Sequence, residues 1–283
     1  MRHFTLLLLS VFTVYQAKAD ILIPLDKYPT GEKRFNLQIN GSHDTSTPWL
    51  STTSFGVDED GQMGNPENWT SEQIDEDNHS VSHRLIMNSI SLRLSYRVWD
   101  NLSLWAGIGT TNFTHEETFR DDDDLSSTIF SKNMVPIYSG GLGYGHAFTD
   151  RFFMSTQPGV RYANSDNMTT EVYYQGKTIP LRDLSLRRYL EWAVPVVAGY
   201  ALGNFVPYAG ILYKDYTMKD RYEFTKTYAG EDYTVRIDET FHARHKLYAL
   251  AGVNYFLADN ISLGVNGSFG KRQSVQLQFN ISF

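Results

Sequence analysis

Four segments of the chain alternate between apolar and polar side chains with a period of two residues. Over 90–98 every even position is apolar and every odd position is polar. The same period occurs over 261–269, over 275–283, and over 233–257, where most apolar residues are at odd positions. Because successive side chains of a strand point to opposite faces, this pattern predicts β-strands with one apolar and one polar face.

Short turns and long polar stretches separate these strands unevenly. Tight turns containing Asp, Asn or Gly are expected at 100–101, 149–150, 203–204 and 258–260, and aromatic residues flank most of them. The other connections are polar and of variable length, over 43–83, 115–132 and 164–183. Short turns with aromatic residues at one end and long loops at the other indicate a membrane barrel rather than a soluble sandwich.

The predicted fold class is therefore all-β, a transmembrane up-and-down antiparallel β-barrel of about ten strands. The expected strands are 35–42, 84–99, 102–114, 133–148, 151–163, 185–202, 205–228, 233–257, 261–270 and 274–283. In strand 205–228 neither set of alternate positions is clearly apolar, so its facing is not predicted. The segment 49–57 is long enough for a further hairpin. Barrels of eight or twelve strands stay open as alternatives. An even strand number puts both ends of the barrel on the periplasmic side.

The N-terminus has the pattern of a secretory signal peptide. A basic start at Arg2 precedes an apolar run over 4–14, and Ala17-Lys18-Ala19 fits a signal-peptidase site. We expect a signal peptide over 1–19, a periplasmic leader over 20–34 and a single barrel domain over 35–283. After 1–19 there is no run of about 18 apolar residues, which excludes a helical membrane protein.

Composition narrows the classes of function. The 283 residues include no cysteine, which excludes disulfides, thiolate metal sites and cysteine nucleophiles. The formal net charge is −7 and Lys and Arg do not cluster, so nucleic acid is not an expected partner. An exported chain without cysteine suits the outer membrane of a Gram-negative bacterium, which is the expected location.

The signal peptide, the alternating last strand ending on Phe283, and the short-turn and long-loop asymmetry resemble small Gram-negative outer-membrane barrels of the OmpA, OmpX and opacity-protein type. The resemblance implies that the barrel-assembly machinery reads the last strand. Outer-membrane lipid and lipopolysaccharide are the other expected partners. The resemblance covers nearly the whole mature chain as architecture. Many activities share this scaffold, so it does not assign one. We expect a monomer.

If the apolar face contacts lipid, the polar face lines the lumen. The charged residues expected there are Arg93, Arg97, Arg161, Arg187, Glu191, Arg236, Asp238, His242, Arg244 and Lys246. In a barrel of about ten strands such side chains fill the interior, because open channels belong to about 16 strands and more. The excess of Arg and Lys over acids leaves a narrow, anion-leaning pore as an alternative.

The expected outer loops are acidic. Their carboxylates include Asp58, Asp60, Asp75, Asp77, Asp121 and Asp123, which form a possible cation-binding set that would take Ca²⁺ or Mg²⁺. Neither run has the ligand spacing of an EF-hand loop, and charged runs are usually solvated surface. We therefore predict no resident metal and no cofactor.

Catalytic signals are weak. Similarity to the omptin proteases is faint, since their motifs do not match residue by residue, and Asp238 and His242 would lie about 13 Å apart along one strand. His146, Ser155, His242 and Ser268 offer the residue types of a His–Ser lipid-modifying enzyme, without a motif. The glycines of 140–145 are expected to make room for large neighbours or to bend the wall.

The function expected from the sequence is non-enzymatic: a surface protein for envelope integrity, adhesion or ligand contact through its acidic outer loops. A narrow pore for small solutes is one alternative, and an omptin-like or lipid-modifying enzyme at the rim is a second.

Overall fold

The computed structural model describes residues 35–59, 62–63, 67–70, 80–99, 101–120, 125–174, 177–180, 184–228, 231–270 and 273–283. The expected signal peptide and leader, 1–34, lie outside these residues. Almost all of the described chain is β-strand. No helix that is long and apolar enough to cross a membrane occurs in this part of the chain.

The strands are β1 (Phe35–Ser46), β2 (Pro48–Glu59), β3 (Gln62–Met63), β4 (Glu67–Thr70), β5 (Ser80–Trp99), β6 (Leu102–Arg120), β7 (Leu125–Ala147), β8 (Phe152–Thr156), β9 (Gly159–Tyr174), β10 (Lys177–Pro180), β11 (Leu184–Tyr200), β12 (Phe205–Tyr228), β13 (Glu231–Ala243), β14 (Leu247–Ala258), β15 (Ile261–Phe269) and β16 (Ser274–Ser282). All strand pairs are antiparallel, and β2 pairs with β13 rather than with β1, which precedes it in the chain.

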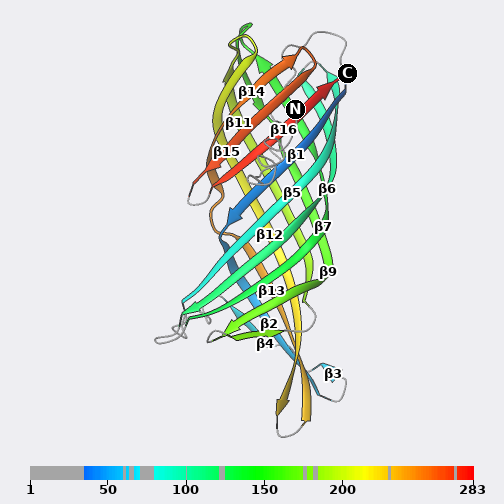
Figure 1. The fold of residues 1–283 in the computed structure, drawn as a ribbon, viewed down its shortest axis with the longest axis vertical. Coiled ribbons are helices and arrows are strands. Elements are labelled where there is room, and N and C mark those ends of the chain that lie inside the picture. The colour runs from blue at the N-terminus through cyan, green and yellow to red at the C-terminus, as the bar shows by residue number, and fades with distance from the viewer. Residues whose placement is uncertain are drawn as a thin grey trace, which may run out of the picture.

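These strands close into a barrel of ten, which confirms the predicted fold class (Figure 1). Around the wall the order is β1, β5, β6, β7, β8 with β9, β11, β12, β14, β15 and β16. Pairing of β1 with β16 joins the first and last strands, and Phe35 and Phe283 exchange backbone hydrogen bonds of 3.0 and 2.9 Å. β3 and β4 pair with β2 outside this ring, so the region 49–57 does not raise the strand number to twelve.

The four short connections lie where the sequence predicts them, at the end of the barrel that holds Phe35 and Phe283. Gly203 adopts φ +63°, which suits glycine in the turn between β11 and β12. The long polar connections are different from expectation. β6, β7 and β9 extend through most of 115–132 and 164–174, because polar residues continue the ladder beyond the apolar band. The β12–β13 hairpin projects furthest, at the end of the barrel opposite Phe35 and Phe283 (Figure 1).

In the half of the barrel near Phe35 and Phe283, apolar side chains point outward and polar ones inward. On β5, Leu92 and Leu94 are about 45% exposed, whereas Ser91 and Arg93 are buried. The outward apolar run on β5 covers 90–98, which matches the roughly 9–11 residues that a tilted strand needs to cross a bilayer. This band is the lipid-facing band of the barrel.

In the other half the arrangement is reversed. Apolar side chains fill the interior there and form one buried cluster of Leu85, Met87, Phe113, Val135, Ile137, Ala163, Tyr189, Tyr216, Met218, Phe241 and Ala243. Polar residues such as Thr110 and Lys219 point outward at this end. The long strands therefore change from a membrane-type to a water-type distribution of side chains along their length.

The expected strand 233–257 is broken at residues 244–246, and the break changes its facing. β14 pairs with β15, whereas β13 leaves β15 and pairs with β2. In β13 the odd residues are buried, including Ile237 and Phe241, but in β14 the even residues Leu250 and Asn254 are buried. The apolar odd positions thus face the interior in β13 and lipid in β14.

Candidate functional site

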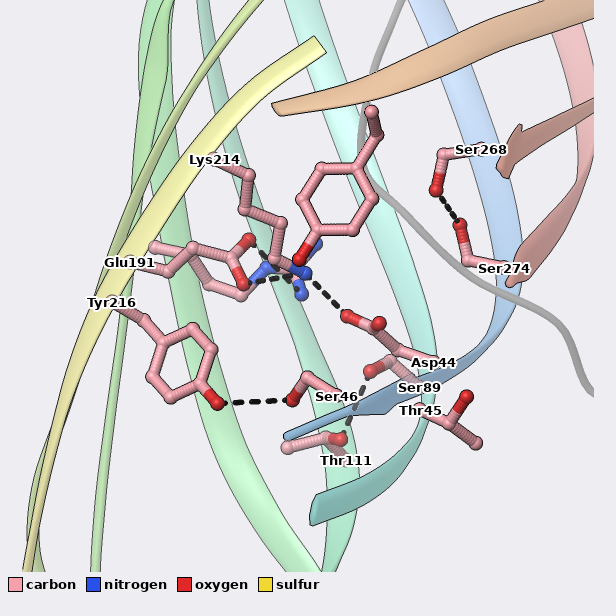
Figure 2. Close-up of polar contacts among 12 residues, drawn as sticks. Asp44, Thr45, Ser46, Ser89, Thr111, Glu191, Lys214, Tyr216, Ser268 and Ser274 are labelled. Atoms are coloured by element: carbon pink, nitrogen blue, oxygen red, sulfur yellow. Dashed lines mark hydrogen bonds and ion pairs between the residues drawn. The ribbon is translucent and has the colours of Figure 1, made fainter. Parts of the chain in front are cut away.

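Lys214 of β12 is the centre of a buried chain of ion pairs inside the barrel. Its ammonium contacts Asp44 Oδ2 of β1 and lies 2.9 Å from Glu191 Oε2 of β11, and Figure 2 shows it reaching between the two carboxylates. Glu191 Oε1 lies 3.6 Å from Arg161 Nη1 of β9. At this level residues 244–246 lie between β12 and the end of β1, because Lys214 N donates to Lys246 O and Arg244 N donates to Thr47 O. The contact with Asp44 therefore passes over this segment on the inner face of the wall.

Aromatic and histidine contacts also cross the interior beside and beyond this chain. The Phe113 ring of β6 meets the Tyr189 ring of β11 edge to face, with centroids 5.2 Å apart. His115 Nδ1 of β6 lies 3.6 Å from Asp220 Oδ2 of β12, and the His115 ring lies 4.7 Å from that of Phe241. None of these pairs joins strands that are neighbours in the wall.

Arg93 of β5 makes the crossing contact nearer to Phe35 and Phe283. Its guanidinium donates to Gln157 Oε1 at 3.0 Å and lies 3.5 Å from the centroid of the Trp105 ring. A Cβ built on Gly141 would lie 2.7 Å from the Trp105 indole, and one on Gly159 would lie closer still. These glycines therefore make room for the Trp105 ring. Gly141 belongs to the stretch 140–145, for which the sequence predicts this role.

The buried charges of the interior nearly balance. Among the side chains that the structure describes, the buried cations are Arg93, Arg161 and Lys214, and the buried carboxylates are Asp44, Glu191, Asp220 and Glu239. The excess of cations that an anion-leaning pore requires is absent from this described interior. Since a buried charge is costly unless it is paired, the network is best understood as a packing of the interior.

Four of the expected lumen residues lie on the inward face. Arg93, Arg161 and Glu191 are 3–5% exposed and belong to the contacts above. Arg97 is half-buried nearer to the short turns. The side chain of Arg187 lies outside the described residues.

The other five expected lumen residues point outward, so their predicted placement is wrong. They are Arg236, Asp238, His242, Arg244 and Lys246. The cause is the break between β13 and β14, which shifts the alternation by one position. On the outer surface Asp238 accepts two hydrogen bonds from Arg221, at 2.6 and 3.0 Å, instead of approaching His242. Lys246 donates to Asp215 at 2.7 Å, and this hydrogen bond raises the pKa of the Lys246 ammonium.

The possible cation-binding set is only partly within the described chain. Asp58 lies in β2, where its backbone pairs with Thr234 and Met63, and its side chain is not described. Asp60, Asp75, Asp77, Asp121 and Asp123 lie outside the described residues. Among the described residues no group of three or more His, Asp or Glu side chains is placed to hold a metal ion.

The catalytic candidates are not brought together. His242 is hydrogen-bonded to Thr217 on the outer surface, at 3.2 Å. His146 is exposed and packs against Phe148, whereas Ser268 is buried and hydrogen-bonded to Ser274. No described pair among these residues therefore has the geometry of a nucleophile and its base.

Among the described residues, the buried charged and histidine side chains that were not predicted from the sequence are Asp44, His115, Lys214, Asp220 and Glu239. Lys214 and Asp220 lie in 205–228, where the inward even positions include Leu212 and Met218, so polarity does not mark the face. Asp44 carried a usable signal, because it continues the polar alternation of β1 beyond 35–42.

Comparison with known proteins assigns no family to the chain. No family model and no curated protein matches the chain. Among solved structures, OprG from Pseudomonas aeruginosa is 11% identical, with 89% of this chain and 98% of that chain covered and a TM-score of 0.39. The protease OmpT from Escherichia coli is 10% identical, with 95% and 100% covered and a TM-score of 0.43. The toluene transporter TodX from Pseudomonas putida is 12% identical, with 90% of each chain covered and a TM-score of 0.35.

All three are bacterial proteins of diverse function, two of them named as outer-membrane proteins. The closed ring of ten antiparallel strands confirms the barrel architecture that the sequence predicts. At this level of identity the likeness does not carry the activity of any of these proteins to this chain.

Proposed function

We propose that this chain is a non-enzymatic, non-conducting protein of the Gram-negative outer membrane that acts at the cell surface. The observation that carries the proposal is the filled interior. Lys214 reaches Asp44, Arg93 reaches Gln157 and His115 reaches Asp220, and each pair joins residues that do not lie on neighbouring strands of the wall. A ten-stranded barrel is close to the size at which side chains fill the inside.

The proposed location rests on the outer surface of the barrel. The lipid-facing band has the height that a bilayer requires, and short turns at one end with long strands at the other are typical of outer-membrane barrels. Trp99, Phe148, Phe205 and Tyr255 are exposed near the short turns. Aromatic residues in such a ring are favoured at the lipid–water interface.

The proposed surface role rests on the far half of the barrel. Strands β12 and β13 continue well beyond the lipid-facing band and have an apolar interior, so they form a stable platform outside the membrane. We propose that this platform and its acidic connections contact lipopolysaccharide or a ligand. The barrel-assembly machinery as partner and the monomeric state belong to the same proposal.

The test uses the full mature protein refolded in phospholipid vesicles. Swelling in glycine or arabinose reports a pore, and a large porin in the same vesicles is the positive control. We expect swelling equal to that of protein-free vesicles. In parallel, the protein is incubated with a peptide library and with lipid A. Solute entry would support the pore alternative instead, and cleavage of peptide or lipid would support an enzyme.

A further inference from the structure

A group of cations lies on the outer surface of β11, β12 and the adjoining residues 244–246. The sequence pattern places two of them, Arg244 and Lys246, in the lumen and assigns no site to the others. The basic patch consists of Arg188, Lys219, Arg221, Arg244 and Lys246, whose side chains are exposed or half-buried. Two carboxylates accompany them, Asp215 with Lys246 and Asp238 with Arg221. In a chain of formal charge −7, the five cations of the basic patch outnumber the two carboxylates that pair with them.

The basic patch begins where the lipid-facing band ends. On the outward face of β11 and β12 the rings of Trp192 and Tyr213 lie 4.9 Å apart, and only Leu190 separates Trp192 from Arg188 on that face of β11. On β14 the last outward apolar residue is Leu247, which is 64% exposed. Lys246 is the next residue along the chain. Since paired Trp and Tyr mark the lipid–water interface, the cations lie at and beyond the level of the lipid headgroups.

Within the patch Arg188 and Lys219 face each other directly. They are register partners on β11 and β12, and both side chains are exposed. Directly opposed residues on one face have Cβ atoms about 4.5–5.5 Å apart, and like charges there are destabilising. Among the described side chains, neither of the two has a carboxylate partner. An anion between them would convert this repulsion into two attractions.

We propose that the basic patch binds a phosphate group of lipopolysaccharide in the outer leaflet, with Arg188 and Lys219 holding the phosphate between them. Guanidinium and ammonium groups form strong, charge-assisted hydrogen bonds to phosphate oxygens. The acyl chains of the same lipid would lie against Trp192 and Tyr213 below. The lipid is favoured over a free ion because the patch is continuous with the lipid-facing band. This inference does not depend on whether the interior conducts.

The test compares two variants of the full mature protein in detergent micelles. The double variant Arg188→Gln, Lys219→Gln removes the opposed pair. The matched control is Arg84→Gln, an outward arginine of β5 that is 52% exposed and paired with Glu116 elsewhere on the wall. Native mass spectrometry counts bound bisphosphorylated lipid A, and enzymatically dephosphorylated lipid A is the second probe. The single variant Lys219→Gln is used if the double variant does not fold.

We expect wild type and Arg84→Gln to bind lipid A with equal affinity. The affinity of the double variant should be lower by about tenfold or more, because it has lost charged hydrogen bonds to the phosphate. Dephosphorylated lipid A should bind wild type as weakly as the variant binds the intact lipid. Equal binding by the double variant would overturn the proposal, as would an equal loss in Arg84→Gln. Full displacement of lipid A by millimolar inorganic phosphate would assign the patch to free phosphate and also contradict the proposal.

Discussion

Lys214 Nζ lies 2.9 Å from Glu191 Oε2 inside the barrel, and the same ammonium contacts Asp44 at the end of β1. Glu191 also accepts a hydrogen bond from Tyr189 and lies 3.6 Å from Arg161. Each of these charges is buried, so each depends on the others for its solvation. This relationship joins four strands through one set of side chains.

Removal of one carboxylate from this network should be costly. We predict that Glu191→Ala destabilises the barrel by about 3–5 kcal/mol, because it leaves buried cations without their partner. The measurement is urea unfolding of refolded protein in phospholipid vesicles. Glu116→Ala, which breaks the exposed pair with Arg84, is the control and should cost about 0–1 kcal/mol. Similar losses in both variants would mean that the buried network does not hold the wall together.

A second prediction concerns two adjacent residues in the lipid-facing band, one on each face of the wall. Val265 is 43% exposed on the outer face of β15, and Asn266 is 3% exposed on the inner face. Val265→Arg should cost about 2–4 kcal/mol if it lies near the middle of the bilayer. Asn266→Leu should be milder, and Val265→Leu should be nearly neutral. Equal tolerance of Val265→Arg and Val265→Leu in unfolding experiments would show that no lipid covers this face.

A third prediction concerns the space around Trp105. A methyl group on Gly159 would overlap the indole, so Gly159→Ala should displace Trp105 and its contact with Arg93. Overpacking of this kind typically costs about 1–3 kcal/mol. Gly41→Ala is the control, since a methyl group there would have no atom within 4 Å. Unfolding in urea measures both, and a greater loss of stability in Gly41→Ala would contradict the prediction.

A fourth prediction tests the reversed facing of β13. The chain has no cysteine, so a single introduced thiol reports on one position. His242→Cys should react with a membrane-impermeant maleimide on the folded protein, because His242 points outward. Phe241→Cys should react only after unfolding, because Phe241 is buried. The opposite order of reactivity would restore the facing that the sequence pattern suggests.

Strand identity was predictable wherever one face contacts lipid. Over 90–98 the alternation of Ile90, Leu92 and Leu94 with polar residues gives both the strand and its facing, because lipid and interior differ in polarity there. Beyond the bilayer the interior is itself apolar. Phe241 continues the odd-numbered pattern of Leu247 although the two side chains point to opposite faces. A period-two pattern does not show the break between them. The apolar side of the wall changes from interior to exterior at the same place, so the odd positions stay apolar on both sides of the break.

The interior network was less accessible to the same reasoning. Arg93, Arg161 and Glu191 were predicted from alternation, but Lys214 was not, because its strand carries apolar residues on its inward face. The partner of Lys214 on β1 is fixed by the closure of the barrel, which brings Asp44 opposite it. Such a contact depends on strand tilt and register around the whole wall, and no local pattern contains that information.

Single-channel recording in planar lipid bilayers shows whether the filled interior blocks the passage of ions. With the full mature protein inserted at both polarities, we expect a current that stays at the level of the bare membrane. Reproducible discrete conductance steps, absent from protein-free bilayers, would contradict it, because ions would then be passing Lys214, Glu191 and Asp44.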